Sequence, residues 1–131
     1  MVVDTSVLVA IFRKEPKAAI FVDRIDAADE ARLSLVSFLE TFSVLCSRRV
    51  GGTRDQVERL VRDLGLVLRP VDEAQHQHAL DALLRFGKGR HPAALNIGDC
   101  FSYALARTLG APLLFKGEDF AQTDIIPAWR P

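Results

Sequence analysis

The sequence is poor in cysteine and carries no excess charge of either sign. Its two cysteines, Cys46 and Cys100, are too few for a disulfide framework and lack the spacing of a metal site. The 17 basic and 17 acidic residues give a formal net charge of zero. Global charge therefore gives no reason to expect a nucleic-acid partner, and binding of that kind would need a local basic patch.

Long apolar runs and low-complexity segments are also missing. The apolar stretch MVVDTSVLVAIF contains Asp4 and has no basic residues before it, so we expect neither a membrane span nor a signal peptide. The apolar share of 49% and the charged share of 26% are typical of a globular protein and exclude a disordered chain. We expect a cytoplasmic protein without membrane association, folded as a single domain over residues 1–131.

Short apolar runs alternate with stretches of helical periodicity along the chain. Buried strands are expected at residues 1–3, 32–36, 66–71 and 112–115, with a short edge strand at 124–126. Helices are expected at residues 7–12, 16–28, 37–50, 53–64, 72–86 and 96–109. This alternation predicts a three-layer α/β/α fold around a central, mostly parallel sheet of four to five strands.

Three carboxylates lie where an apolar run gives way to a helix: Asp4, Glu40 and Asp99. Two more acids, Glu118 and Asp119, follow the last apolar run, PLLF. Parallel strands bring their C-terminal ends to one edge of a sheet, so these acids are expected to meet in one cleft. Clustered carboxylates repel one another, and a hard divalent cation such as Mg²⁺ or Mn²⁺ relieves that repulsion. The pattern predicts a metal-dependent enzyme, and a phosphodiester is the substrate that suits such a site best.

Each of the first three acids also has a purely structural interpretation. Asp4 precedes a helix and suits the N-cap position. Ser37 with Glu40, and Asn96 with Asp99, have the spacing of a capping box. A non-catalytic binding module whose acids only cap helices is therefore one alternative to an enzyme.

A phospho-acceptor signalling domain is a second alternative. Such domains gather acids at the ends of parallel strands and carry a lysine after the last one, where this chain has Lys116. They typically need a pair of acids after the first strand, but Thr5 follows Asp4 here. A phosphatase of the haloacid dehalogenase type would need an acid at position 6, which is Ser6.

Four segments in order along the chain, VVDTSVLVA, SFLET, LNIGDCFSYALA and PLLFKGEDF, resemble those of a PIN domain. They are most similar to the VapC toxin ribonucleases of bacterial VapBC toxin–antitoxin pairs. The resemblance implies a PIN-like fold and a Mg²⁺- or Mn²⁺-dependent endoribonuclease that uses a metal-activated water and leaves 5′-phosphate and 3′-hydroxyl ends. It also implies a homodimer silenced by a VapB-type antitoxin.

The resemblance also assigns roles to the acids. Asp4, Glu40 and Asp99 match its catalytic positions, with Asp4 and Asp99 as the main metal ligands. The fourth acidic position of many members falls on Gly117 in this chain. We expect Asp119 to be the fourth catalytic acid, with Glu118 as the other candidate.

Other polar residues stand close to these acids in the sequence. Thr5, Ser6 and Asn96 are candidates for holding a water, a phosphate oxygen or a neighbouring acid. The candidates for contacts with the RNA backbone are the basic residues next to a proposed ligand: Lys88, Arg90, His91 and Lys116. The apolar stripe of the helix expected at 53–64, together with Phe12, Phe38 and Phe42, is the expected surface for partners.

Overall fold

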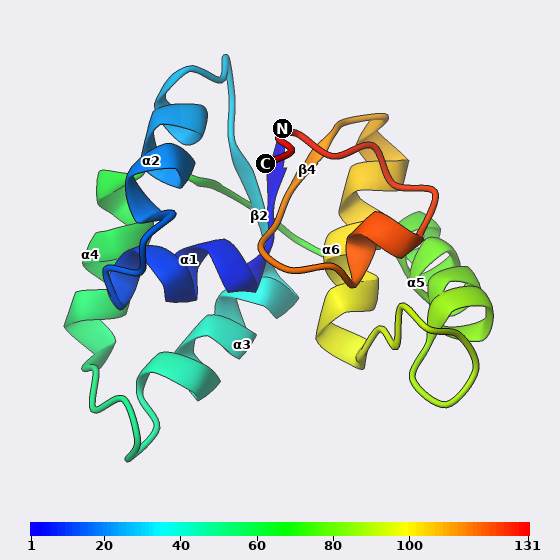
Figure 1. Ribbon diagram of the computed structural model, residues 1–131, viewed down its shortest axis with the longest axis horizontal. Coiled ribbons are helices and arrows are strands. Elements are labelled where there is room, and N and C mark those ends of the chain that lie inside the picture. The colour runs from blue at the N-terminus through cyan, green and yellow to red at the C-terminus, as the bar shows by residue number, and fades with distance from the viewer.

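The computed structural model describes residues 1–131 and contains one parallel sheet of four strands in the order β3-β2-β1-β4 (Figure 1). The strands are β1 (Val2–Val3), β2 (Arg32–Ser34), β3 (Val67–Arg69) and β4 (Leu113–Leu114). Val2 is in register with Arg32 on one side and with Leu113 on the other. The strand β1 is therefore central, and the acid that follows it lies in the middle of the sheet edge.

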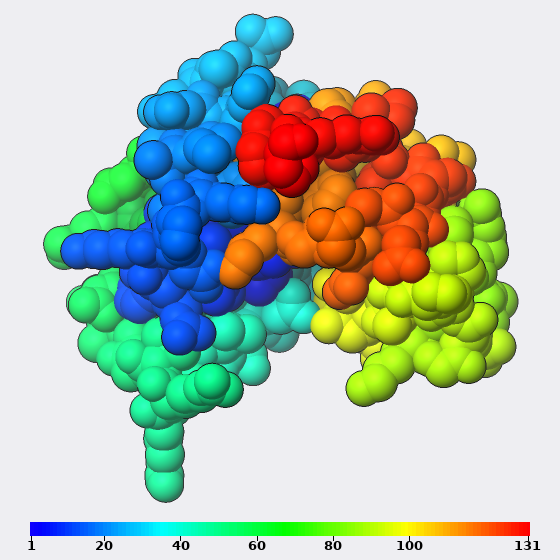
Figure 2. All heavy atoms as spheres, viewed as in Figure 1, coloured from blue at the N-terminus to red at the C-terminus, as the bar shows by residue number.

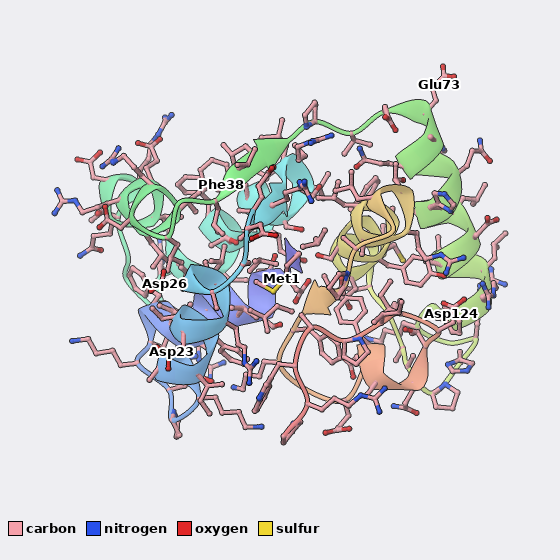
Figure 3. All side chains as sticks on the ribbon, turned by 90° about the horizontal axis from the view of Figure 1, so that it is seen from above. Met1, Asp23, Asp26, Phe38, Glu73 and Asp124 are labelled. Atoms are coloured by element: carbon pink, nitrogen blue, oxygen red, sulfur yellow. The ribbon has the colours of Figure 1, made fainter.

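Six α-helices and one 3₁₀-helix surround the sheet. They are α1 (Thr5–Phe12), α2 (Ala18–Asp26), α3 (Leu35–Leu45), α4 (Arg54–Asp63), α5 (Glu73–Phe86), α6 (Ile97–Leu109) and η1 (Phe120–Gln122). Seen from above, α5 and α6 lie on one side of the strands, and α1, α2 and α4 lie on the other (Figure 3). No helix is long and apolar enough to cross a bilayer.

The two faces of the sheet bury separate hydrophobic cores. Val2 and Leu113 belong to the core that the sheet shares with α5 and α6. Val3, Leu33 and Leu114 belong to the core on the side of α1, α2 and α4. Successive strand residues point to opposite faces, so the short runs VV and LL each serve both cores. The predicted three-layer fold is confirmed.

The junction after β2 differs from the sequence-based expectation. The strand ends at Ser34 rather than at residue 36, and α3 runs from Leu35 to Leu45 rather than over 37–50. The cause is the Ser34 hydroxyl, which caps α3 by accepting a hydrogen bond from the Val36 amide at 3.2 Å. Ser37 is therefore inside the helix, and the expected capping box of Ser37 and Glu40 is wrong.

The expected edge strand at 124–126 does not form. The Leu113 amide donates to the Ile126 carbonyl at 2.9 Å, and one isolated bridge joins Leu113 to Pro127. Pro127 has no amide hydrogen, which limits further pairing along this segment. Asp124 instead accepts a hydrogen bond from the Tyr103 hydroxyl at 2.8 Å, which ties the segment to α6.

Candidate active site

A polar cavity of about 390 Å³ opens where the first turns of α1 and α6 meet α3 and the loop after β4. Its lining residues are Asp4, Thr5, Ser6, Val9, Glu15, Glu40, Val44, Asn96, Asp99, Lys116 and Gly117. In Figure 2 the surface is hollowed at the lower centre, between the cyan segment and the yellow start of α6. The cavity brings together Asp4, Glu40 and Asp99, as the sequence predicted.

Asp4 is buried at the bottom of the cavity, with 2% of its surface exposed. It caps α1, because its Oδ2 accepts from the Ser6 amide at 2.9 Å. The same oxygen accepts from the Ser6 hydroxyl at 2.6 Å, and Oδ1 accepts from the Ser102 hydroxyl at 2.6 Å. Asp4 therefore does cap α1, but the cap needs only the bond from the Ser6 amide. The two hydroxyl donors are not explained by capping. Ser102 was not predicted from the sequence.

Asp99 stands in the first turn of α6 and forms the expected capping box with Asn96. The Asn96 side chain accepts from the Asp99 amide at 2.8 Å, and Asp99 Oδ2 accepts from the Asn96 amide at 3.0 Å. Burial raises the pKa of Asp99 to about 7, and the negative charges of Asp4, Glu40 and Asp119 add to that effect. The hydrogen bond from Asn96 opposes the rise without cancelling it. The site therefore holds more negative charge than its donors compensate.

Glu40 reaches the cavity from α3 and does not cap that helix. Burial raises its pKa, and the charge of Asp4 raises it further. A Cβ atom on Gly98 would overlap the Glu40 carboxylate, so the missing side chain in the first turn of α6 leaves room for this acid. Glu40 therefore packs against α6 and is not a freely solvated surface acid.

The fourth acid is less well placed. Neither Asp119 nor Glu118 lines the cavity, whereas Gly117 does. Asp119 still lies near enough for its charge to raise the pKa of Asp99. Glu118 lines a different pocket, beside Lys17 and Trp129. Asp119 thus remains the better of the two candidates.

Glu15 lines the cavity and was missed in the sequence analysis. It lies in the turn between α1 and α2 and forms an ion pair with Lys116, which lines the same cavity. Because Glu15 does not follow a strand, the pattern used to find the other acids could not identify it. The short length of α1 brings this turn back over the cavity.

The predicted basic cluster is divided in the structure. Lys116 lines the cavity, whereas Lys88 and Arg90 are exposed in the loop between α5 and α6. His91 is partly buried, accepts a hydrogen bond from the Ala93 amide at 3.0 Å and stands edge-on to Phe86. These contacts indicate that His91 stabilises the loop and packs it against α5.

The donor groups of the cavity suit a hard divalent cation. Carboxylate and hydroxyl oxygens are the ligands that Mg²⁺ and Mn²⁺ prefer. Burial, and then the charges of the neighbouring acids, raise the pKa of Asp99, and a bound cation would offset both effects. No group of three or more His, Cys, Asp or Glu side chains converges in metal-binding geometry. Mg²⁺ is commonly held by one or two carboxylates and several waters, so Asp4 and Asp99 fit it without a closed cage.

Comparisons with known proteins identify the family of the chain. The family model described as "PIN domain" matches residues 1–126. Ribonuclease VapC28 of Mycobacterium tuberculosis (strain ATCC 25618 / H37Rv) is 44% identical over 126 residues, which are 95% of each chain. Ribonuclease VapC30 of Mycobacterium tuberculosis (strain CDC 1551 / Oshkosh) is 43% identical over 131 residues, the full length of both chains.

Solved structures share the fold. The crystal structure of Mycobacterium tuberculosis VapC20, described as a sarcin-ricin loop cleaving toxin, has a TM-score of 0.74 at 19% identity and covers 99% of this chain and 98% of that one. A toxin–antitoxin complex from Klebsiella pneumoniae has a TM-score of 0.71 at 14% identity, with the same coverage of 99% and 98%.

The fold, the acidic cavity and the family match together define a PIN-domain nuclease, and the chain belongs to that family. Within it, the full-length relatives place the chain among the VapC ribonucleases, the toxin components of toxin–antitoxin systems. PIN-domain VapC nucleases generally depend on divalent metal ions. The resemblance seen in the sequence is confirmed.

The raised pKa of Asp99 makes the stability of the metal-free protein depend on pH. Because the folded state holds this proton more tightly than the unfolded state, the free energy of unfolding falls as pH rises from the ordinary aspartate value of 3.8 toward about 7. Asp99→Asn removes the charge and keeps a side-chain oxygen for the Asn96 amide. In chelator, we expect Asp99→Asn to raise the midpoint of thermal unfolding relative to the parent more at pH 8 than at pH 5.

The control for this measurement is Asp119→Asn, which removes an exposed charge from the same neighbourhood. Its effect on the unfolding midpoint should be smaller at both pH values. If the unfolding midpoints of Asp99→Asn and the parent differ by the same amount at pH 5 and at pH 8, the pKa of Asp99 is not raised by folding.

Proposed function

We propose that this chain is a Mg²⁺- or Mn²⁺-dependent endoribonuclease that hydrolyses RNA phosphodiesters in the cytoplasm. The observation that carries the proposal is the convergence of Asp4, Glu40 and Asp99 on one cavity, where the pKa of Asp99 is raised to about 7. Such a site needs a cation to balance its charge, and a phosphodiester brings further negative charge that only a cation-loaded site accepts.

The residues of the cavity divide the work of hydrolysis. Asp4 and Asp99 would hold the ion, which when bound supplies an activated water and neutralises charge on the phosphate. Glu40, which lines the cavity, would accept a hydrogen bond from the attacking water and orient it. Lys116, which also lines the cavity, would contact a non-bridging phosphate oxygen.

The structural interpretation of the acids accounts for only part of this arrangement. Asp4 does cap α1, and Asp99 forms the capping box of α6 with the N-cap residue Asn96. Glu40 does not cap α3, which is capped by Ser34 instead. A binding module that used acids only as caps would have no reason to hold the partly buried Glu40 carboxylate against Gly98.

The chain should cleave single-stranded RNA with Mg²⁺ or Mn²⁺, leave 5′-phosphate and 3′-hydroxyl ends, and lose activity in excess EDTA. Asp4→Asn should lower the cleavage rate by at least the roughly 10- to 100-fold that the loss of a group supporting a metal ligand costs, because Asp4 is itself a proposed ligand. Asparagine caps a helix as well as aspartate does, so the fold should remain. Gel assays with end-labelled RNA measure both effects.

Asp72→Asn is the matched control for that assay. Asp72 caps α5 by accepting from the Gln75 amide at 2.8 Å, as Asp4 caps α1, but it lies outside the cavity. Its variant should cleave RNA at the parent rate. Full activity of the parent in EDTA, or of Asp4→Asn with metal, would contradict the proposed function.

Asp119 is proposed as the fourth acid because its charge reaches Asp99, whereas Glu118 lines another pocket. We expect Asp119→Asn to slow RNA cleavage more than Glu118→Gln does in a side-by-side assay. The two substitutions remove one charge each from adjacent exposed positions, so either serves as control for the other. The reverse order would assign the role to Glu118.

Lys88 and Arg90 are proposed to contact the RNA backbone, because their loop leads directly into α6 and the cavity. The double variant Lys88→Ala, Arg90→Ala should bind RNA more weakly and flatten the salt dependence, by a log–log slope of about 0.7 for each lost phosphate contact. Metal affinity should not change. Arg48→Ala with Arg49→Ala, a second pair of exposed cations, is the comparison. If that pair changes binding instead, the phosphate contacts lie there.

We propose that the chain forms a homodimer and binds a VapB-type antitoxin. Val57 and Val61 on α4 are buried in the core, so this part of the apolar stripe is not available to partners. An apolar groove between α5 and α6 remains open and is lined by Leu80 and Ile97, which are 41% and 67% exposed. Leu84, which is 52% exposed, lies beside the groove, one turn beyond Leu80 on α5. We assign self-association to this groove and the antitoxin to another face.

Light scattering at micromolar concentration should give the mass of a dimer, and Leu84→Glu should give that of a monomer, because a buried charge without a partner opposes association. Ile20→Glu on α2 is the control and should leave the dimer intact, since Ile20 is similarly exposed but lies on the opposite side of the sheet. A monomeric parent protein would contradict the proposed assembly.

A further inference from the structure

Ser102 is a buried hydroxyl on α6 that the roles assigned above do not use. It is fully buried, and its Oγ donates to Asp4 Oδ1 at 2.6 Å. The Ser37 hydroxyl lies 3.0 Å from Ser102 Oγ. A carboxylate has no proton to donate, so the Ser102 hydroxyl is the donor to Asp4. Because a serine hydroxyl has only one proton, Ser37 must be the donor to Ser102. A directed chain of hydroxyls thus ends on Asp4.

The hydrogen bonds make the two oxygens of Asp4 unequal. Oδ2 accepts from both the amide and the hydroxyl of Ser6, which occupies its two lone pairs. Oδ1 accepts only from Ser102, which leaves it one lone pair. The oxygen of Asp4 that is available to a cation is therefore the one that Ser102 holds.

Ser102 also connects Asp4 to the helix that carries Asp99. Residues three apart on a helix share a face, so Asp99 and Ser102 stand one turn apart on the same side of α6. A hydrogen bond from Ser102 to Asp4 thus couples the position of one proposed ligand to the element that carries the other. The separation of the two acids then depends on this bond.

The hydroxyl is not needed to fill space. The residues that surround Ser102 along α6 are mostly apolar, and Tyr103, Ala104 and Leu105 are all buried. An alanine would fit the same place without the cost of burying a polar group. A serine at this position is stabilising only because both of its hydrogen bonds are made.

We propose that Ser102 is a positioning residue, which holds the Asp4 carboxylate so that Oδ1 presents its free lone pair to the divalent cation. The inference rests on the proposed function, since it assumes that Asp4 is a metal ligand. Hydrogen bonds that orient ligating groups commonly change metal affinity by about 10- to 100-fold when they are removed.

Calorimetric titration of the purified full-length protein with Mn²⁺ alone tests the proposal. We expect Ser102→Ala to weaken Mn²⁺ binding by about tenfold or more. Ser102→Cys preserves the volume but is a weak donor, and it should also weaken binding, which covers the case in which the alanine variant does not fold. Circular dichroism and thermal unfolding identify the folded variants.

Thr41→Ala is the matched control. Thr41 is another fully buried hydroxyl, and it donates to the Ser37 carbonyl at 2.7 Å but does not contact Asp4. It should lower stability while leaving Mn²⁺ affinity within about twofold of the parent, as expected for a hydroxyl outside the shell that orients the ligand.

The outcomes distinguish a failure of the positioning role of Ser102 from a failure of the proposed function. A parent protein that binds Mn²⁺, with folded Ser102 variants that bind it equally well, overturns the positioning role and leaves the proposed function in place. Equal weakening by Thr41→Ala also overturns it, because the effect would then come from general destabilisation. A parent protein that binds no Mn²⁺ overturns both.

Discussion

The burial of a carboxylate at the end of the central strand is the constraint on which the rest of the structure depends. Asp4 follows β1 directly and is 2% exposed. A buried charge is strongly destabilising unless donors surround it, and three hydrogen bonds from Ser6 and Ser102 supply them. The site is built from the helices that carry these donors.

The arrangement of helix ends reduces the cost of gathering acids. The first turns of α1 and α6 line the cavity, and the partial positive charge of a helix N-terminus favours nearby carboxylates. The Lys116 amide donates to the Ser6 hydroxyl at 3.0 Å, so the loop after β4 is fastened to the first turn of α1. A small parallel sheet with strands of two or three residues is sufficient to support the site, because these loops and helix caps fix the positions of its side chains.

Much of the fold could be predicted because its signals are local. The runs VV and LL and the periodic helices specify the layers, and Asn96 and Asp99 form the capping box that their spacing indicates. Ser37 was misplaced because Ser34, three residues earlier, is an equally good cap and starts the helix sooner. The contributions of Ser102 and Glu15 depend on contacts over 98 and 101 residues of sequence, which no local pattern encodes.

The raised pKa of Asp99 affects how the cavity would bind a cation. With a pKa of about 7, Asp99 exchanges its proton near neutral pH, and a bound proton neutralises part of the negative charge of the cavity. A cation that enters must displace that proton, and loading is therefore an exchange of one positive species for another. Partial protonation thus lowers the negative charge of the cavity and reduces the cost of bringing Asp4, Glu40 and Asp99 together in the folded chain.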